Sequence, residues 1–318
     1  MPRRASRAML HPMKYIAPGI TVLLAFSGVA EAAPTLPAAC MASRAQYEQN
    51  VGNDLSQSGY RAQLGNTAAQ IRIDQASLND AAHRLDTSQL KHANDIAALG
   101  ALLALYGKTT PACDTPQAHQ AAEDIARRIR EGAQPELTWH NVRLMKADRS
   151  YTARTAHIRF LPDTGARSAQ IRVQLSVSGI AEASGKLAPQ SFAADISVPP
   201  RALTDNDGSE GQTMTVRQGE TATINNLHAV FGASNVDGHG FVQPGADWRT
   251  STSQMHLEIT NIGDLLNAVR ANSSAGVTTA LAMAQFMGHR DGNRLSWDVA
   301  LGNGTVTVNN VPLPLPLP

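Results

Sequence analysis

Aromatic residues are scarce in this chain: Phe, Trp and Tyr together make up 4% of its 318 residues. Proteins that bind single-stranded nucleic acid commonly stack the bases on aromatic side chains, so this scarcity argues against such a platform. A charge imbalance is also lacking, because 27 basic residues face 26 acidic ones and the formal net charge is +1. We therefore expect no nucleic-acid partner and no strong attraction to an anionic membrane surface.

Motifs of the common catalytic and cofactor sites are lacking as well. The chain contains no Gly-x-Ser-x-Gly nucleophile turn, no Gly-x-x-x-x-Gly-Lys phosphate loop and no His-Glu-x-x-His zinc motif. Its ten histidines are scattered, without a pair at metal-ligand spacing. We expect a non-enzymatic protein with no cofactor and no metal. The alternative of a hydrolase stays open, because folding assembles some catalytic sites from residues that are distant in the sequence.

The first 32 residues have the composition of an export signal. A basic segment with three arginines and Lys14 precedes the apolar run Tyr15–Val29, and Ala30-Glu31-Ala32 fits a small-x-small cleavage site. We expect cleavage near Ala32 and a mature chain in the periplasm. No later apolar run approaches the roughly 20 residues that span a bilayer, so the mature chain has no expected transmembrane segment. The alternative is an uncleaved signal that stays as a membrane anchor.

Cysteine occurs only twice, at Cys40 and Cys113, and both residues follow the expected cleavage site. In an oxidising compartment such a pair predicts one disulfide. It would close a loop of about 70 residues and stabilise the fold by roughly 4 kcal/mol. A competing interpretation makes Cys40 a lipid-modified residue, since Leu36–Cys40 is similar to a lipobox, although Pro37 stands where leucine is expected.

Hydrophobic periodicity predicts an α+β fold. The apolar face of Asp86–Tyr106 and a second segment that begins at the N-cap Thr115 predict a pair of helices in the N-terminal part. Met41–Asn50 is also expected to begin as a helix. From Glu136 the period changes to two, most clearly in the run of Ile171–Val177, which predicts antiparallel strands with one covered face.

The last third of the chain, Gln212–Pro312, predicts a strand, a helix and a hairpin. Met255–Ile259 alternates, Ile262–Met287 is a helical run of small residues, and Gly302-Asn303-Gly304 is a hairpin turn. We expect a large curled antiparallel β-sheet with an N-terminal helical pair and a C-terminal strand–helix–hairpin. The expected divisions are a signal (1–32), an N-terminal strand with helices (33–135), a sheet domain with a packed helix (136–312) and an extended or disordered Pro-Leu tail (313–318).

Four C-terminal segments carry a resemblance to a known group of proteins: Asp237–Gly240, Met255–Leu266, Gly292–Trp297 and Gly304–Leu313. They resemble the ends of the AsmA-like and YdgA-like periplasmic envelope proteins of Gram-negative bacteria, with Asn310 where glycine is usual. The resemblance implies a long twisted antiparallel sheet that curls around helices, and a link to envelope lipid homeostasis. It implies no catalytic residues.

The methionine- and alanine-rich part of the helical run suggests an apolar groove, because methionine adapts to irregular apolar shapes. The ligand that we expect is a lipid chain, and the simpler alternative is a helix that only covers the sheet. The candidate groove consists of two facing strand residues and three helix residues: Leu257, Ile259, Leu281, Met283 and Phe286. A second hypothesis is an envelope assembly factor that docks on a protein partner through a sheet edge or the Pro-Leu tail.

Overall fold

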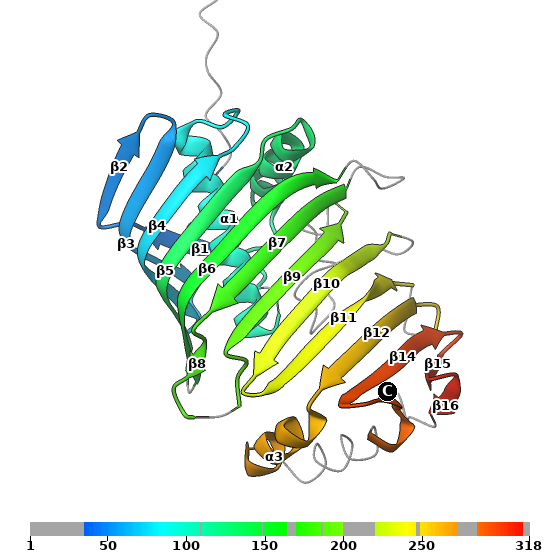
Figure 1. Cartoon of the computed structure of the whole chain (residues 1–318). Coiled ribbons are helices and arrows are strands. Elements are labelled where there is room, and N and C mark those ends of the chain that lie inside the picture. The colour runs from blue at the N-terminus through cyan, green and yellow to red at the C-terminus, as the bar shows by residue number, and fades with distance from the viewer. Residues whose placement is uncertain are drawn as a thin grey trace, which may run out of the picture. The chain divides into compact units, whose positions relative to one another are not determined.

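In the computed structural model, the described strands form one antiparallel sheet (Figure 1). The structure describes residues 35–108, 110–147, 149–163, 170–185, 187–199, 220–245, 249–272 and 285–313. The first strands are β1 (Met41–Arg44), β2 (Tyr47–Val51), β3 (Asp54–Leu64), β4 (Gln70–Asp80), β5 (Pro135–Lys146), β6 (Arg149–Asp163), β7 (Gln170–Ser178) and β8 (Ala181–Glu182). The later strands are β9 (Ser191–Val198), β10 (Ala222–Phe231), β11 (Ser234–Gln243), β12 (Thr252–Thr260), β13 (His289–Asp291), β14 (Arg294–Gly302), β15 (Thr305–Val308) and β16 (Val311–Leu313). The helices are α1 (Thr87–Tyr106), α2 (Pro116–Arg130) and α3 (Ile262–Asn272).

The sheet is built mostly by pairing strands that follow one another in the chain. Its main path runs β1-β3-β4-β5-β6-β7-β9-β10-β11-β12-β14-β15-β16, and β2, β8 and β13 pair beside it. The expected antiparallel sheet is therefore confirmed. The expected division at 135/136 falls between α2 and β5, and the sheet continues across it because β4 pairs with β5.

The predicted α+β class with an N-terminal helical pair is wrong, because the described residues are mainly β and four strands precede the first helix. Met41–Asn50 forms β1 and most of β2 instead of a helix. That segment has no apolar stripe at helical spacing, so its conformation follows from pairing with β3. In β3 alternate side chains such as Tyr60, Ala62 and Leu64 are buried.

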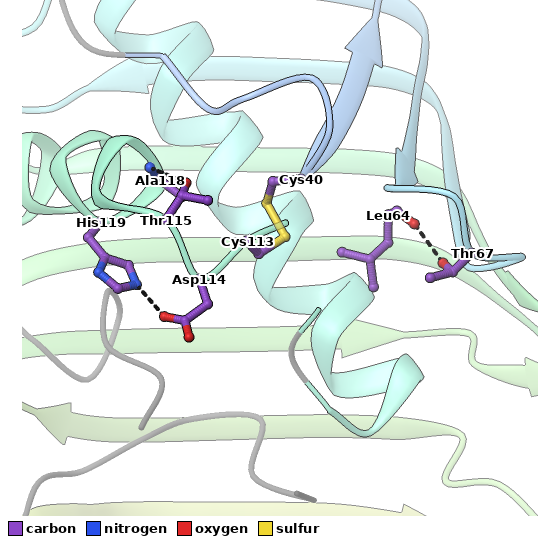
Figure 2. Close-up of a disulfide and its surroundings, with 8 residues drawn as sticks. All are labelled: Cys40, Leu64, Thr67, Cys113, Asp114, Thr115, Ala118 and His119. Atoms are coloured by element: carbon purple, nitrogen blue, oxygen red, sulfur yellow. Dashed lines mark hydrogen bonds and ion pairs between the residues drawn. A yellow bond between two sulfur atoms is a disulfide. The ribbon is translucent and has the colours of Figure 1, made fainter. Parts of the chain in front are cut away.

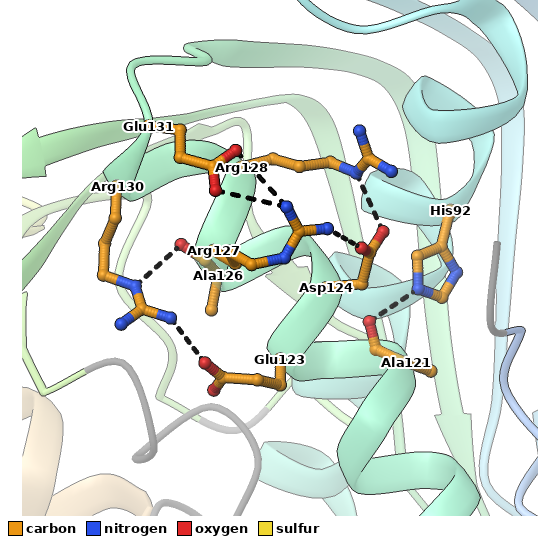
Figure 3. A network of polar contacts seen from close by, with 9 residues as sticks. All are labelled: His92, Ala121, Glu123, Asp124, Ala126, Arg127, Arg128, Arg130 and Glu131. Atoms are coloured by element: carbon orange, nitrogen blue, oxygen red, sulfur yellow. Dashed lines mark hydrogen bonds and ion pairs between the residues drawn. The ribbon is translucent and has the colours of Figure 1, made fainter. Parts of the chain in front are cut away.

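Helices α1 and α2 cover one face of the N-terminal half of the sheet (Figure 1). α1 packs on β3, β4 and β5, and α2 packs on β6 and β7. The predicted N-cap is confirmed: the Thr115 hydroxyl accepts a hydrogen bond from the Ala118 amide, with Pro116 at the first helical position. Figure 3 shows His92 of α1 joined to the Ala121 carbonyl of α2 at 2.8 Å, and the charged side chains of α2 paired with one another.

The predicted disulfide is present between Cys40, just before β1, and Cys113, in the loop between α1 and α2 (Figure 2). Their Cα atoms are 4.4 Å apart and 73 residues separate them in the chain. Both side chains are buried among the apolar residues under α1. The bond therefore joins the first strand to the connection between the two helices.

At the C-terminal end, α3 follows β12 and the β14–β15 hairpin closes the sheet. The predicted turn is confirmed, because Gly302 pairs with Thr305 and both Asn303 and Gly304 have positive φ angles. Leu313, expected at the start of the extended or disordered tail, is the last residue of β16, which pairs with β15 at an edge where proline is tolerated. Residues 314–318, like the signal segment 1–32 and most of the second half of the Ile262–Met287 run, lie outside the described residues.

Candidate functional site

The structure describes three of the five residues that the sequence suggested for an apolar groove. Leu257 and Ile259 lie on the same face of β12, as their spacing requires, and Ile259 is 8% exposed beneath α3. Phe286 is 89% exposed. Leu281 and Met283 lie outside the described residues. The strand half of the predicted groove is thus brought together with α3, and no contact joins it to Phe286 among the described side chains.

Apolar side chains line up across the sheet on the face that carries the helices. Strand register places them directly opposite one another, so that each row crosses many strands. One row consists of Leu55, Leu78, Leu137, Ile158, Leu175, Ala194, Leu227, Gly238, Leu257 and Trp297. Period-two alternation in every strand, combined with this register, produces one continuous apolar face.

The apolar face is buried in two separate clusters. The N-terminal cluster lies under α1 and α2 and includes Tyr60, Leu90, Ile129 and Leu137. The C-terminal cluster lies under α3 and consists of Ile259, Ile262, Leu265, Leu266, Val269, Leu295, Trp297 and Val308.

Between the clusters lies a part of the same face that we call the apolar floor: Phe192, Ile196, Ile224, Leu227 and Met255. These side chains belong to neither cluster and are only partly buried. Strands β9 to β12 cover three strand spacings, about 14 Å, which sets the width of the floor. Sequence reasoning missed these residues as a group, although the alternation of Phe192–Val198 was visible.

Gly238 marks the centre of the floor. A Cβ atom there would lie 2.9 Å from Leu257 Cδ2 and 4.0 Å from Leu227 Cδ2. The absence of a side chain at Gly238 therefore leaves room for the Leu257 side chain over β11. Any larger residue at this position must displace the Leu257 side chain.

A chain of polar side chains lies inside the N-terminal cluster. Trp139 Nε1 donates to Asn94 Oδ1 at 2.7 Å, and Asn94 Nδ2 donates to Gln57 Oε1 at 3.1 Å. Gln57 Nε2 in turn donates to Glu48 Oε1 at 2.8 Å, and Lys91 reaches the same oxygen at 2.8 Å. Asn94 is 0% exposed. Because these groups satisfy one another's hydrogen bonds, they hold α1 on the sheet.

The Tyr60 hydroxyl, close to this chain, donates a hydrogen bond to Asp95 Oδ1 at 2.7 Å. Burial raises the pKa of Asp95 above its ordinary value. Burial, together with the adjacent Asp95 carboxyl, raises the pKa of Tyr60 well above its ordinary value, so the phenol keeps its proton at neutral pH. This hydrogen bond therefore links β3 to α1, with the neutral Tyr60 hydroxyl as the donor and the Asp95 carboxyl as the acceptor.

The polar face of the C-terminal half carries histidine–aspartate pairs. His228 Nδ1 lies 2.6 Å from Asp237 Oδ1, and His256 Nδ1 lies 2.7 Å from Asp298 Oδ1. His239 is opposite His256, with ring centroids 5.2 Å apart. Among the residues that the structure describes, no three His, Cys, Asp or Glu side chains converge in a way that could hold a metal ion. These pairs act as cross-strand contacts.

Helices in the described ranges do not combine the length and apolar character needed to cross a membrane. No family model, curated protein or solved structure matches this chain. The resemblance to AsmA-like and YdgA-like proteins therefore stays a prediction.

Proposed function

We propose that this protein is an exported, non-enzymatic protein of the cell envelope that binds a lipid chain on its apolar floor. The observation that supports the proposal is the part of the apolar face that lies between the two buried clusters and belongs to neither. There, Ile196, Ile224 and Leu227 belong to a face that is apolar over its whole width, yet they are only partly buried. A soluble protein rarely leaves such a patch without a function.

The energetics favour an acyl chain. Burying a methylene contributes about 0.8 kcal/mol, so a chain that lies across a floor about 14 Å wide gains enough to stay bound during purification. The described side chains of the floor carry no charge, which suits a ligand without polar groups along its length. Export with cleavage near Ala32 and delivery to the periplasm belong to the same proposal, and the Cys40–Cys113 disulfide is consistent with an oxidising compartment.

The experiment is native mass spectrometry with lipid extraction on protein purified from the periplasm without detergent. Wild type is expected to carry a lipid, and the double variant Ile224→Gln/Leu227→Gln is expected to retain at least about tenfold less. Val51→Gln is the matched control, because Val51 is an exposed apolar strand residue on β2, outside the floor. A wild-type protein without lipid, or equal retention in the floor and control variants, would overturn the proposal.

A further inference from the structure

Four arginines form one straight row on the polar face of the N-terminal half of the sheet. Arg44 of β1 is directly opposite Arg61 of β3, Arg61 is opposite Arg72 of β4, and Arg72 is opposite Arg143 of β5. All four are exposed. Their neighbours in the strands, such as Ala62 and Ile71, are buried under the helices, so alternation places this arginine row on the opposite face.

Among the described residues, no carboxylate forms an ion pair with the arginine row. Strands lie about 4.8 Å apart, and like charges directly opposite one another destabilise a sheet. In the described part of the chain, none of these four guanidinium groups forms an ion pair. Other arginines do: Arg172 is held by Asp195, and Arg127 of α2 is held by Asp124 and Glu131 (Figure 3). What distinguishes the row is that four arginines lie directly opposite one another on adjacent strands.

The surface along the arginine row is hollowed on both sides. A hollow of about 740 Å³ is lined by Arg61, Arg72 and Arg143, and it adds a further arginine, Arg154, with one carboxylate, Asp74. On the other side a hollow of about 350 Å³ is lined by Arg44, Arg61 and Arg72.

The backbone also departs from a regular ladder at this hollow. Gly59 of β3 and Asn141 of β5 have positive φ angles and are skipped in the strand pairing, and Gly179, also at positive φ, directly follows the end of β7. All three line the larger hollow. Such interruptions reorient side chains and are frequent beside binding sites. Two independent observations, unpaired charge and a shaped hollow, thus coincide on one surface.

We propose that the arginine row binds an anion with two or more phosphate groups. The guanidinium group is planar and can donate two parallel N–H hydrogen bonds to the oxygens of one phosphate. Every cationic side chain that lines the larger hollow is an arginine, and none is a lysine. Adjacent guanidinium groups at strand spacing match adjacent phosphates. Such groups occur on a free polyphosphate or on the headgroups of an anionic lipid surface. This site lies on the face opposite the apolar floor and does not depend on the proposed function.

The test measures binding of two probes to the full mature protein. Inorganic tripolyphosphate is titrated in a calorimeter, and vesicles of phosphatidylglycerol in phosphatidylcholine are used in a flotation assay. Arg61→Gln/Arg72→Gln is expected to weaken binding at least about tenfold. Arg294→Gln is the control, because Arg294 is 59% exposed at the far end of the same sheet and is paired with Glu258. Binding of tripolyphosphate identifies a soluble ligand, and binding to vesicles alone identifies a lipid headgroup; either result supports the site.

A thermal melt separates loss of the site from loss of the fold. Because the double variant removes repulsion between opposed charges, its melting temperature is expected to equal or exceed that of wild type while anion binding falls. Three results would overturn the proposal: neither probe binds wild type, the control variant loses binding as strongly as the double variant, or the double variant melts lower and binds unchanged.

Discussion

At the scale of single residues, the polar face contains carboxylates whose ionisation depends on the fold. Arg172 donates from Nε to Asp195 Oδ1 at 2.7 Å and from Nη2 to Oδ2 at 2.6 Å. These hydrogen bonds lower the pKa of Asp195, and Gln174 adds a further donor. The ionised carboxylate is thus favoured more strongly in the folded chain than in the unfolded chain.

Asp195→Asn is expected to make the chain less stable at neutral pH and to remove part of its acid sensitivity. A lowered folded pKa means that the contribution of Asp195 is complete above its unfolded pKa of about 3.9 and is lost as the pH falls through the folded pKa. The difference in unfolding free energy between wild type and variant should therefore be constant near neutrality and shrink in acid. Urea unfolding across a pH series measures it, and a difference that persists unchanged into strong acid would contradict the assignment.

At the scale of elements, the docking of α1 on the sheet depends on the polar chain from Lys91 to Trp139. Its inner end is closed to solvent, since Asn94 and Gln57 are buried, whereas Lys91 is 44% exposed. Buried hydrogen bonds matter most when one partner is removed and the other is left unsatisfied. The loss of unfolding free energy on removing one side chain of this polar chain should therefore be larger for its buried members than for its exposed ones.

Trp139→Phe is expected to lower the free energy of unfolding by on the order of 3 kcal/mol, because it leaves Asn94 Oδ1 without its donor and opens a cavity. Lys91→Gln, at the exposed end of the same chain, should cost less than about 1 kcal/mol. Chemical denaturation of both variants measures whether the loss of unfolding free energy is larger at the buried end of the polar chain than at its exposed end. Equal losses would show that the chain does not position α1.

At the scale of the whole molecule, one sheet carries two buried clusters, and the disulfide belongs to only one of them. Cys40 and Cys113 both lie in the N-terminal cluster. The C-terminal cluster under α3 contains neither. A bond that closes a loop of 73 residues acts mainly by restricting the unfolded chain.

Cys40→Ser/Cys113→Ser is expected to lower stability by about 4 kcal/mol. Hydrogen exchange should show the loss of protection in β3, β4 and α1, while β12 and β14 keep theirs. Uniform loss over both clusters would instead mean that the sheet unfolds as one cooperative unit.

The sequence predicted those features whose causes lie within a few residues. The Thr115 cap and the Asn303-Gly304 turn follow from local hydrogen bonding and backbone preference. The alternation around Ile171 predicted a half-covered antiparallel strand. The helix expected at Met41–Asn50 is absent because weak local preference there yields to pairing with β3.

The sequence by itself predicted the apolar face of clearly alternating strands such as β7, where the long helices begin, and the disulfide. Only the tertiary structure decided which strands are neighbours and in what register. Arg61 and Arg143 are ordinary polar-face residues in the sequence, and Ile224 and Met255 are ordinary apolar ones. They become an arginine row and an apolar floor because hydrogen bonds between distant strands set a register that no local pattern encodes.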